Sequence, residues 1–229
     1  MVDRKVAGED EEDRRVPALW PVHEEMSVRT QYTGASGEKL RRLQNISVII
    51  MEYSRRQEEI KMAFKETDIS SLKFNPFDKI SKQWMLVTAG NGDSCNTMTA
   101  SWGGVGIMWG KPVATVYIRP QRYTKEFIDK NGYFTLSFLP EEYRRSLNVC
   151  GSVSGRNVED KWQEAGLNPF EIDGTAAVEE AEEIFVCRKL YAQEMLPECF
   201  IDGECDTKWY PEKDYHMMYI AEIVKVLEK

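Results

Sequence analysis

The stretch NTMTASWGG, at residues 96–104, decides the fold. Small polar residues alternate there with apolar ones, which is typical of a β-strand with one buried face. The paired glycines at its end would let a ligand approach the backbone closely. Asn96, Thr99 and Ser101 can offer hydrogen bonds, and Trp102 or Trp109 can cover an aromatic ring. On the pattern alone, a polar-faced barrel strand that ends in a loop is the simpler interpretation.

Most of the chain around this stretch shows the same alternation. We expect five further strands, at residues 84–88, 113–118, 132–138, 183–192 and 217–227. Short helical patterns lie between them, at residues 125–130, 141–149 and 159–165. Strands outnumber helices, and the turns are not spaced like those of βαβ units. The sequence therefore predicts a mainly β fold, a closed or partly open antiparallel barrel with peripheral helices.

The N-terminal part of the chain has a different character. Its first 35 residues hold almost no apolar periodicity, which predicts disorder or a loose attachment. Apolar residues at spacings of three and four then predict an amphipathic helix at residues 37–61, which could dock on the following domain or on a partner subunit. We therefore expect an N-terminal extension at residues 1–61, disordered and then helical, and a compact domain at residues 62–229.

Composition restricts the class of protein. Hydrophobic residues make up 42% and charged residues 30% of the 229 positions, which is typical of a globular protein. The net charge of −8 argues against a nucleic-acid partner. No apolar run approaches the length of a membrane helix, and no apolar signal region opens the chain. Together with the odd number of widely spread cysteines, five, this predicts a cytoplasmic protein with reduced thiols and no membrane partner.

The sequence shows no catalytic or metal-binding motif with the residue types and the spacing that such a site requires. The chain has only two histidines, His23 and His216, which cannot form a metal cluster by themselves. Cys199 and Cys205 are too far apart for a zinc knuckle, and there is no second pair. We therefore predict no metal site and leave catalytic residues unassigned. His216 is open to a structural or a catalytic role.

Two arginines precede one of the predicted helices. The turn RPQRYT, at residues 119–124, leaves the strand at 113–118 and enters the helix, for which Thr124 is a natural N-cap. Guanidinium groups beside a helix N-terminus can hold a phosphate. A solvated turn with two surface arginines is the slightly favoured alternative on the pattern alone.

A flexible loop rich in glycine and serine forms the third candidate segment. GSVSGRNVEDKW, at residues 151–162, presents Arg156 and then Lys161 at a predicted helix start. Cations on a mobile loop can meet a negatively charged second substrate. A solvated loop explains the pattern equally well.

Taken in order, these motifs resemble the flavin reductase-like, flavoredoxin-type family. The resemblance rests on the segments 96–104, 119–124, FTLSF at 134–138, and SGR at 154–156 followed by Asp160 and Lys161. It covers about residues 62–229 and does not cover the extension. It implies the FMN-binding split-barrel fold.

The resemblance also implies which residues hold the cofactor. The strand would line the isoalloxazine of FMN, the arginine turn would hold its phosphate, and the loop would border the flavin or a nicotinamide donor. The implied cofactor-binding residues are Asn96, Met98, Thr99, Ala100, Ser101, Trp102, Arg119, Arg122, Tyr123, Thr124, Ser154, Gly155, Arg156 and Lys161.

The activity that the resemblance implies is that of an FMN-binding oxidoreductase. NAD(P)H would pass a hydride to the flavin, and electrons would go onward to an unknown acceptor, for which an electron-acceptor protein is one candidate. This hydride step requires no acid–base residue of the protein. The alternative is an FMN-carrying electron-transfer protein without NAD(P)H activity of its own. The family also implies a homodimer with the flavin near the subunit interface.

Overall fold

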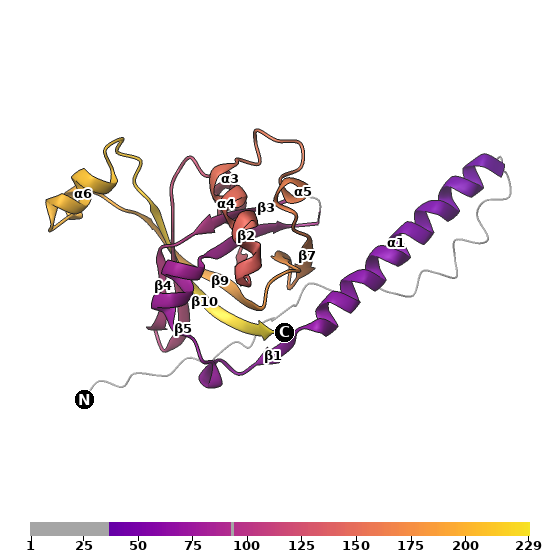
Figure 1. The fold of residues 1–229 in the computed structure, drawn as a ribbon, viewed down its shortest axis with the longest axis horizontal. Coiled ribbons are helices and arrows are strands. Elements are labelled where there is room, and N and C mark those ends of the chain that lie inside the picture. The colour runs from indigo at the N-terminus through magenta and orange to yellow at the C-terminus, as the bar shows by residue number, and fades with distance from the viewer. Residues whose placement is uncertain (1–36, 93) are drawn as a thin grey trace, which may run out of the picture. The chain divides into compact units, whose positions relative to one another are not determined.

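The computed structural model describes residues 37–92 and 94–229 of the chain (Figure 1). The chain divides into two compact units, residues 1–51 and 52–229. No helix in the described part of the chain is long and apolar enough to cross a membrane.

Helix α1 (Gly37–Ala63) occupies the place of the helix that the sequence predicts at residues 37–61. The first unit contributes its N-terminal part, and the second unit contributes its last turns. The disorder predicted for residues 1–35 lies outside the described residues. The domain boundary predicted after residue 61 stays a prediction.

One antiparallel sheet forms the framework of the second unit. Within the described residues its strands follow the order β3-β2-β6-β9-β10-β5-β4, with β1 beside β10, and the sheet does not close on itself. This confirms the mainly β fold and its partly open barrel. The strands of the sheet are β1 (Lys65–Thr67), β2 (Met85–Asn91), β3 (Ser94–Ala100), β4 (Gly103–Met108), β5 (Lys111–Ile118), β6 (Tyr133–Phe138), β9 (Glu183–Glu194) and β10 (Met217–Glu228).

Short helices and one small hairpin surround the sheet. In Figure 1, α3 and α4 lie beside β2 and β3, whereas α6 lies on an excursion that extends away from the barrel between β9 and β10. The helices are α2 (Pro76–Asp78), α3 (Tyr123–Lys130), α4 (Arg144–Ser152), α5 (Lys161–Ala165) and α6 (Gly203–Trp209), with 3-10 turns at Ile69–Ser71, Glu141–Tyr143 and Pro197–Cys199 and a π-helical turn at Lys79–Gln83. The hairpin consists of β7 (Pro169–Ile172) and β8 (Thr175–Val178).

Strand β2 separates two hydrophobic clusters. Met85 and Val87 face the interior of the barrel, where Met98 and Ala100 of β3 also pack. Leu86, on the opposite face of β2, belongs to an outer cluster that includes residues of α4 and of the β7–β8 hairpin. Both faces of this part of the sheet are therefore buried, which fixes the position and orientation of β3.

The sequence suggests a loop after the NTMTASW stretch, and this prediction is wrong, because the structure has a strand there. Gly103 and the residues after it form β4, which pairs antiparallel with β5. A Cβ atom on Gly103 would lie 2.8 Å from the carbonyl oxygen of Thr115. The glycine is therefore needed for close packing between two strands, a role that residue spacing alone does not distinguish from a loop.

Candidate functional site

Strand β3 can offer a ligand mainly its backbone, because several of its side chains are buried. Met98 and Ala100 are 5% and 8% exposed and pack into the barrel, so only their backbone atoms could reach a ligand. Thr99 faces the other way, and its hydroxyl donates to the carbonyl oxygen of Leu147 at 2.5 Å. Among the described residues, β3 pairs only with β2. Its second edge therefore offers backbone N–H and C=O groups to a ligand.

Three of the predicted segments meet at the start of β3. The side-chain amide of Asn96 donates to the hydroxyl of Thr124 at 2.7 Å. A Cβ atom on Gly155 would lie 2.5 Å from Asn96 Oδ1 and 3.2 Å from the ring of Tyr123. The loop at 154–156 therefore rests directly on β3 and on the start of α3, as the three motifs together suggest.

The predicted helix cap at Thr124 is wrong. Helix α3 begins at Tyr123, and Arg122 occupies the N-cap position without a side-chain capping bond. Thr124 is fully buried, and its hydroxyl accepts from Asn96 instead. The residue types of the turn allow the Thr124 hydroxyl either to cap the helix or to bond to a side chain elsewhere in the fold. A contact with Asn96 of β3, which is distant in sequence, decides between the two.

Arg122 is a partly buried cation that lacks a carboxylate partner. Its Nη1 donates to the carbonyl oxygen of Gly151 at 2.6 Å. In residues 37–92 and 94–229, no carboxylate lies within 4.0 Å of this guanidinium. Burial and the neighbouring Arg119 both lower the pKa of Arg122. This cation is therefore left for an anion to neutralise.

Lys161 adds a second positive charge behind the strand. It is 7% exposed, and its ammonium donates to the carbonyl oxygens of Thr97 at 2.7 Å and Cys150 at 3.1 Å. Burial, and to a lesser degree Arg122, lower its pKa. Lys161 thus ties β3 to α4, and it contributes positive potential rather than a free side chain.

Arg119 has a different environment from Arg122. It forms an ion pair with Asp214, and its Nη2 donates to the carbonyl oxygen of Trp209 at 2.8 Å. Its guanidinium lies 5.1 Å from the ring centroid of Tyr210. One of the two arginines predicted to bind phosphate is therefore already neutralised within the protein.

The loop residues Ser154 and Arg156 are also held by neighbours. Arg156 forms an ion pair with Glu126 and lies 4.7 Å from the ring centroid of Tyr123. Its backbone N–H donates to the hydroxyl of Ser154 at 3.3 Å. These contacts hold the loop against α3. The charge of Arg156 is therefore paired with Glu126 and does not add to that of Arg122.

An aromatic cluster lies at the other end of β3. Trp102 contacts the ring of Trp209 edge-on at 5.0 Å between centroids and that of His216 at 5.3 Å. His216 Nδ1 forms a hydrogen bond of 2.8 Å with the hydroxyl of Tyr210. Burial, assisted by Arg119, lowers the pKa of His216 to about 4, so its imidazole is neutral at neutral pH.

Sequence reasoning singled out His216 but did not identify Trp209 and Tyr210, which the β9–β10 excursion brings to the same cluster. The aromatic residues and the histidine between 209 and 216 were the available signal. The side chains of this excursion also help to line a cavity of about 690 Å³. From the predicted set, Ser101 and Trp102 line the same cavity.

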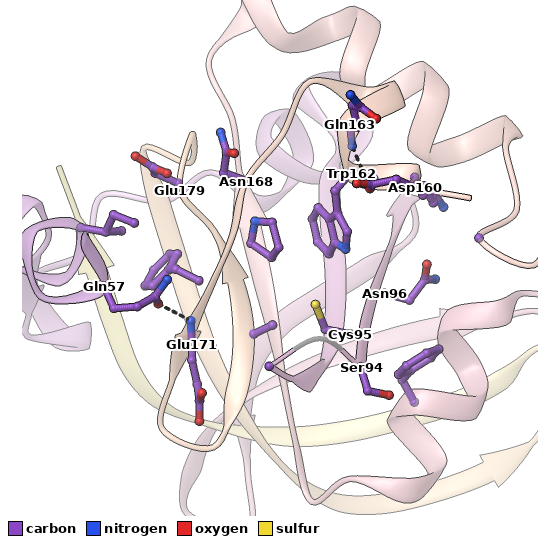
Figure 2. A pocket seen from close by; sticks show the side chains of 18 of the residues that line it. Gln57, Ser94, Cys95, Asn96, Asp160, Trp162, Gln163, Asn168, Glu171 and Glu179 are labelled. Atoms are coloured by element: carbon purple, nitrogen blue, oxygen red, sulfur yellow. Dashed lines mark hydrogen bonds between the residues drawn. The ribbon is translucent and has the colours of Figure 1, made fainter. Parts of the chain in front are cut away.

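A larger cavity, of about 900 Å³, adjoins the start of β3 (Figure 2). It shares Asn96, Tyr123, Gly155 and Lys161 with the predicted set. Residues of α1, α5 and β7 help to complete its walls, and none of these α1 residues was predicted from the sequence to bind a ligand. In the described part of the chain, no three residues of the types His, Cys, Asp and Glu are grouped as a metal site would require.

Comparison with known proteins identifies the family. Residues 77–229 match the family model described as the flavin reductase like domain. The chain therefore belongs to the flavin reductase-like family, which confirms the resemblance seen in its motifs. No curated protein sequence matches the chain.

Solved structures support the same fold. The FMN-binding domain of a flavin reductase-like enzyme from Shewanella baltica aligns with a TM-score of 0.51 at 17% identity, over 72% of this chain and 76% of that one. Flavoredoxin from Methanosarcina acetivorans gives 0.51 at 19%, over 69% and 75%. Flavoredoxin of Desulfovibrio vulgaris gives 0.50 at 23%, over 72% and 77%. These similarities establish the split-barrel fold of this chain.

Proposed function

We propose that this protein is an FMN-dependent oxidoreductase that accepts a hydride from NAD(P)H and passes electrons to a further acceptor. The observation that carries the proposal is the Arg122 cation, which has no carboxylate partner in the described residues and is bonded to Gly151, where a Cβ atom would lie 3.5 Å from Thr99 of β3. A phosphate-bearing planar ligand needs a cation at one end and, along its ring, a hydrogen-bonding edge such as that of β3.

The residues present fit the phosphate of FMN. The guanidinium of Arg122 would bind it, since one backbone carbonyl leaves most of its five N–H donors free. Lys161 would add positive potential without direct contact, because its ammonium is already bonded to two backbone carbonyl oxygens, whereas Arg119 is neutralised by Asp214. Gly151, whose carbonyl oxygen holds Arg122, fixes the orientation of the guanidinium.

The residues at the other end of β3 fit the ring. The free backbone edge between Thr99 and Ser101 could pair with the polar edge of a flavin ring, and Trp102, 38% exposed, could cover part of its face. Trp209 and His216 hold Trp102 in place. Met98 and Ala100 would contribute backbone only, because their side chains fill the barrel.

The chemistry would come mainly from the cofactor, since bound FMN supplies a two-electron acceptor for hydride. The protein would bind and orient it, and would exclude water with the aromatic cluster around Trp102. His216 would not act as a proton donor at neutral pH, because its imidazole is neutral and bonded to Tyr210. Arg122 would hold the phosphate throughout.

We extend the proposal to a homodimer in a reducing, cytoplasmic environment. Adjacent large apolar side chains are exposed at the end of β4, with Ile107 77%, Met108 40% and Trp109 57% exposed. Such residues mark an association surface in a monomer, and a second copy of this chain would cover them. All five cysteines are unbridged, which supports a reducing compartment. Light scattering on wild type and Ile107→Lys tests the dimer, since the lysine should reduce the mass to that of one chain.

An anaerobic visible spectrum tests the activity. Purified protein saturated with FMN is mixed first with NADH and then, in a separate sample, with NADPH. Bleaching of the bound flavin by either donor supports the oxidoreductase and identifies its donor. Flavin that stays oxidised with both donors contradicts the reductase and favours the electron-transfer carrier, whose FMN is then reduced by a partner protein.

A further inference from the structure

The cavity of about 690 Å³ adjoins the end of β3 at which the flavin ring would lie. Ser101 and Trp102 line it, and the excursion that carries α6 supplies much of the opposite wall (Figure 1). We propose that this cavity binds the electron acceptor, and that the acceptor is a small uncharged quinone. The inference rests on the proposed function, which supplies the reduced flavin.

The cavity extends beyond the residues that would hold the flavin. Ser101 and Trp102 are the two members of the predicted cofactor set that line it, and Arg122 is not part of its walls. The other lining residues come from the segment before β2, from Gly103 and Tyr117, and from the excursion. An acceptor must lie against the flavin ring to receive a hydride, so a wall shared with the flavin at Trp102 is expected.

The walls of this cavity are mainly apolar and aromatic. Trp102 and Trp209 meet edge-on at 5.0 Å between ring centroids, and the rings of Phe200 and Tyr210 lie 5.6 Å apart. Ile80, which is 5% exposed, also lines the cavity. Flat rings stack on aromatic side chains or meet their edges. The volume lies within the range usual for small-molecule sites, so a quinone ring fits.

The charges of the walls favour an uncharged acceptor. Among the described residues that line the cavity, Asp202 is the only one with a charged side chain. Its carboxylate is exposed and accepts from the backbone N–H of Glu204 at 3.0 Å, as the N-cap of α6. An anion would therefore lose hydration here without gaining a cationic partner. The phosphate groups of NAD(P)H make the donor a poor ligand for the same walls.

Tyr117 supplies a free hydrogen-bond donor for a carbonyl oxygen. It lines the cavity, and its hydroxyl has no hydrogen-bond partner among the described residues. The other tyrosine of the walls, Tyr210, already forms a hydrogen bond of 2.8 Å with a histidine. Tyr117 follows Val116, which pairs with Gly103, so it lies beside the strand end that carries Trp102. A quinone oxygen would accept from this phenol.

The acceptor step balances with the flavin as the electron source. A quinone that takes up two electrons and two protons becomes a hydroquinone. Both electrons and one proton would arrive together as the hydride of the reduced flavin, which is thereby oxidised. The second proton would be taken from solvent as the product leaves. The step therefore needs no further oxidant or reductant.

Two probes of similar size test the cavity by calorimetry on the full-length chain. Duroquinone is uncharged, and mesitoate is an anion. Duroquinone should bind with and without saturating FMN, and at least about tenfold more tightly than mesitoate, because the walls offer an anion no cation. Equal binding of the two probes, or no binding of duroquinone, would overturn the inference. Displacement of duroquinone by FMN would also overturn it, because the cavity would then belong to the flavin.

Thiol labelling locates the site without any substitution. Cys199 and Cys205 line the cavity and are exposed, whereas Cys95 is not part of its walls. The ring of duroquinone is fully methylated and resists addition by thiols. Saturating duroquinone should slow labelling at Cys199 and Cys205 and leave labelling at Cys95 unchanged. Unchanged labelling of Cys199 and Cys205 would place the quinone elsewhere and contradict the inference.

A pair of tyrosine variants tests the hydrogen bond. Tyr117→Phe keeps the ring but removes the donor, and it should weaken duroquinone about threefold to tenfold. Tyr143→Phe is the matched control, since its hydroxyl also has no partner in the described residues and its ring packs against the outer cluster. It should leave the affinity unchanged. Equal effects in two variants that both show cooperative thermal unfolding would contradict the contact with Tyr117.

The kinetics of reoxidation test the role as acceptor. The FMN-loaded chain is photoreduced and mixed anaerobically with duroquinone, and the return of flavin absorbance is recorded. The rate should approach a maximum, with half-saturation near the dissociation constant from calorimetry. A rate that rises in proportion to duroquinone would overturn the acceptor role. A chain that binds duroquinone but not FMN would refute the proposed function and still support the cavity, so the two failures are distinguishable.

Discussion

The two arginines of the RPQRYT turn lie close in sequence and differ in their surroundings. Arg119 is held by the carboxylate of Asp214 and the carbonyl oxygen of Trp209. Arg122 is held by the carbonyl oxygen of Gly151 alone. The first charge stabilises the excursion between β9 and β10, whereas the second remains for a ligand. Residue type therefore does not separate a structural cation from a binding cation, and the partners do.

The largest expected effect comes from removing the unneutralised charge. Arg122→Ala should weaken FMN binding by about 1.5–3 kcal/mol, because it removes a charge-assisted contact with the phosphate. Arg119→Ala should weaken it less and should lower the melting temperature instead, since Asp214 loses its partner. Fluorescence titrations with FMN and riboflavin measure both variants, and only FMN should be affected by Arg122→Ala.

The exposed Arg145 provides a control for this pair, because it carries the same charge on the surface of α4. Arg145→Ala should leave FMN binding unchanged. If Arg119→Ala weakens FMN as strongly as Arg122→Ala, the distinction between the two arginines is wrong.

The second prediction concerns the pH dependence of stability at the Arg119 end. His216 has a folded pKa of about 4 against 6.5 in a solvated chain. The unfolded chain therefore binds the proton first, so the contribution of His216 is complete above pH 6.5 and is lost as the pH falls toward 4. Relative to His216→Gln, the wild type should lose roughly 2 kcal/mol between neutral pH and pH 4.5 in urea unfolding. Parallel losses in the two proteins would show that His216 is not buried as described.

The third prediction tests the close contact at the Arg122 end. Gly155→Ala would place a Cβ atom 2.5 Å from Asn96 Oδ1, so the loop must shift. It should lower stability by about 1 kcal/mol or more and weaken FMN binding in the same titration. Gly132→Ala is the matched control, since its Cβ would meet nothing within 4 Å. Equal effects at the two glycines would remove the argument for a tight loop.

The smallest expected effect separates the cysteines by their environment. Cys199 and Cys205 are exposed on the excursion between β9 and β10, and both should react rapidly with a thiol reagent. Cys150 is buried and its pKa is raised by burial to about 11, and Cys187 is buried with its pKa raised for the same reason. Mass spectrometry after brief labelling should find modification at the first pair and not at the second. Early labelling of Cys187 would contradict its burial in the interior cluster of the barrel.

Much of the framework could be predicted from the sequence because its strands alternate clearly. The segments predicted at 113–118 and 217–227 correspond to β5 and β10, since regular alternation reflects two faces with different burial. Strand β4 contains three glycines and lacks that alternation, so it was missed. The β7–β8 hairpin was missed as well, because its strands are only four residues long.

The site could be predicted only in part. The residues of each motif lie near one another in sequence, and the structure does bring Asn96, Thr124 and Gly155 together. Contacts over long sequence separations carry no such signal. The ion pair that neutralises Arg119 is formed with Asp214. The side chain of Gln57 accepts a hydrogen bond from the backbone N–H of Glu171. Only the fold shows which polar atoms remain free.

A parallel titration of the wild-type protein with FMN and with riboflavin tests the central claim most directly. The two ligands differ only in the phosphate, so the ratio of their dissociation constants measures what the Arg122 cation contributes. We expect FMN to bind at least about tenfold more tightly than riboflavin, since a charge-assisted contact contributes about 1.5–3 kcal/mol. Equal affinity for the two ligands, or no binding of FMN, would contradict it.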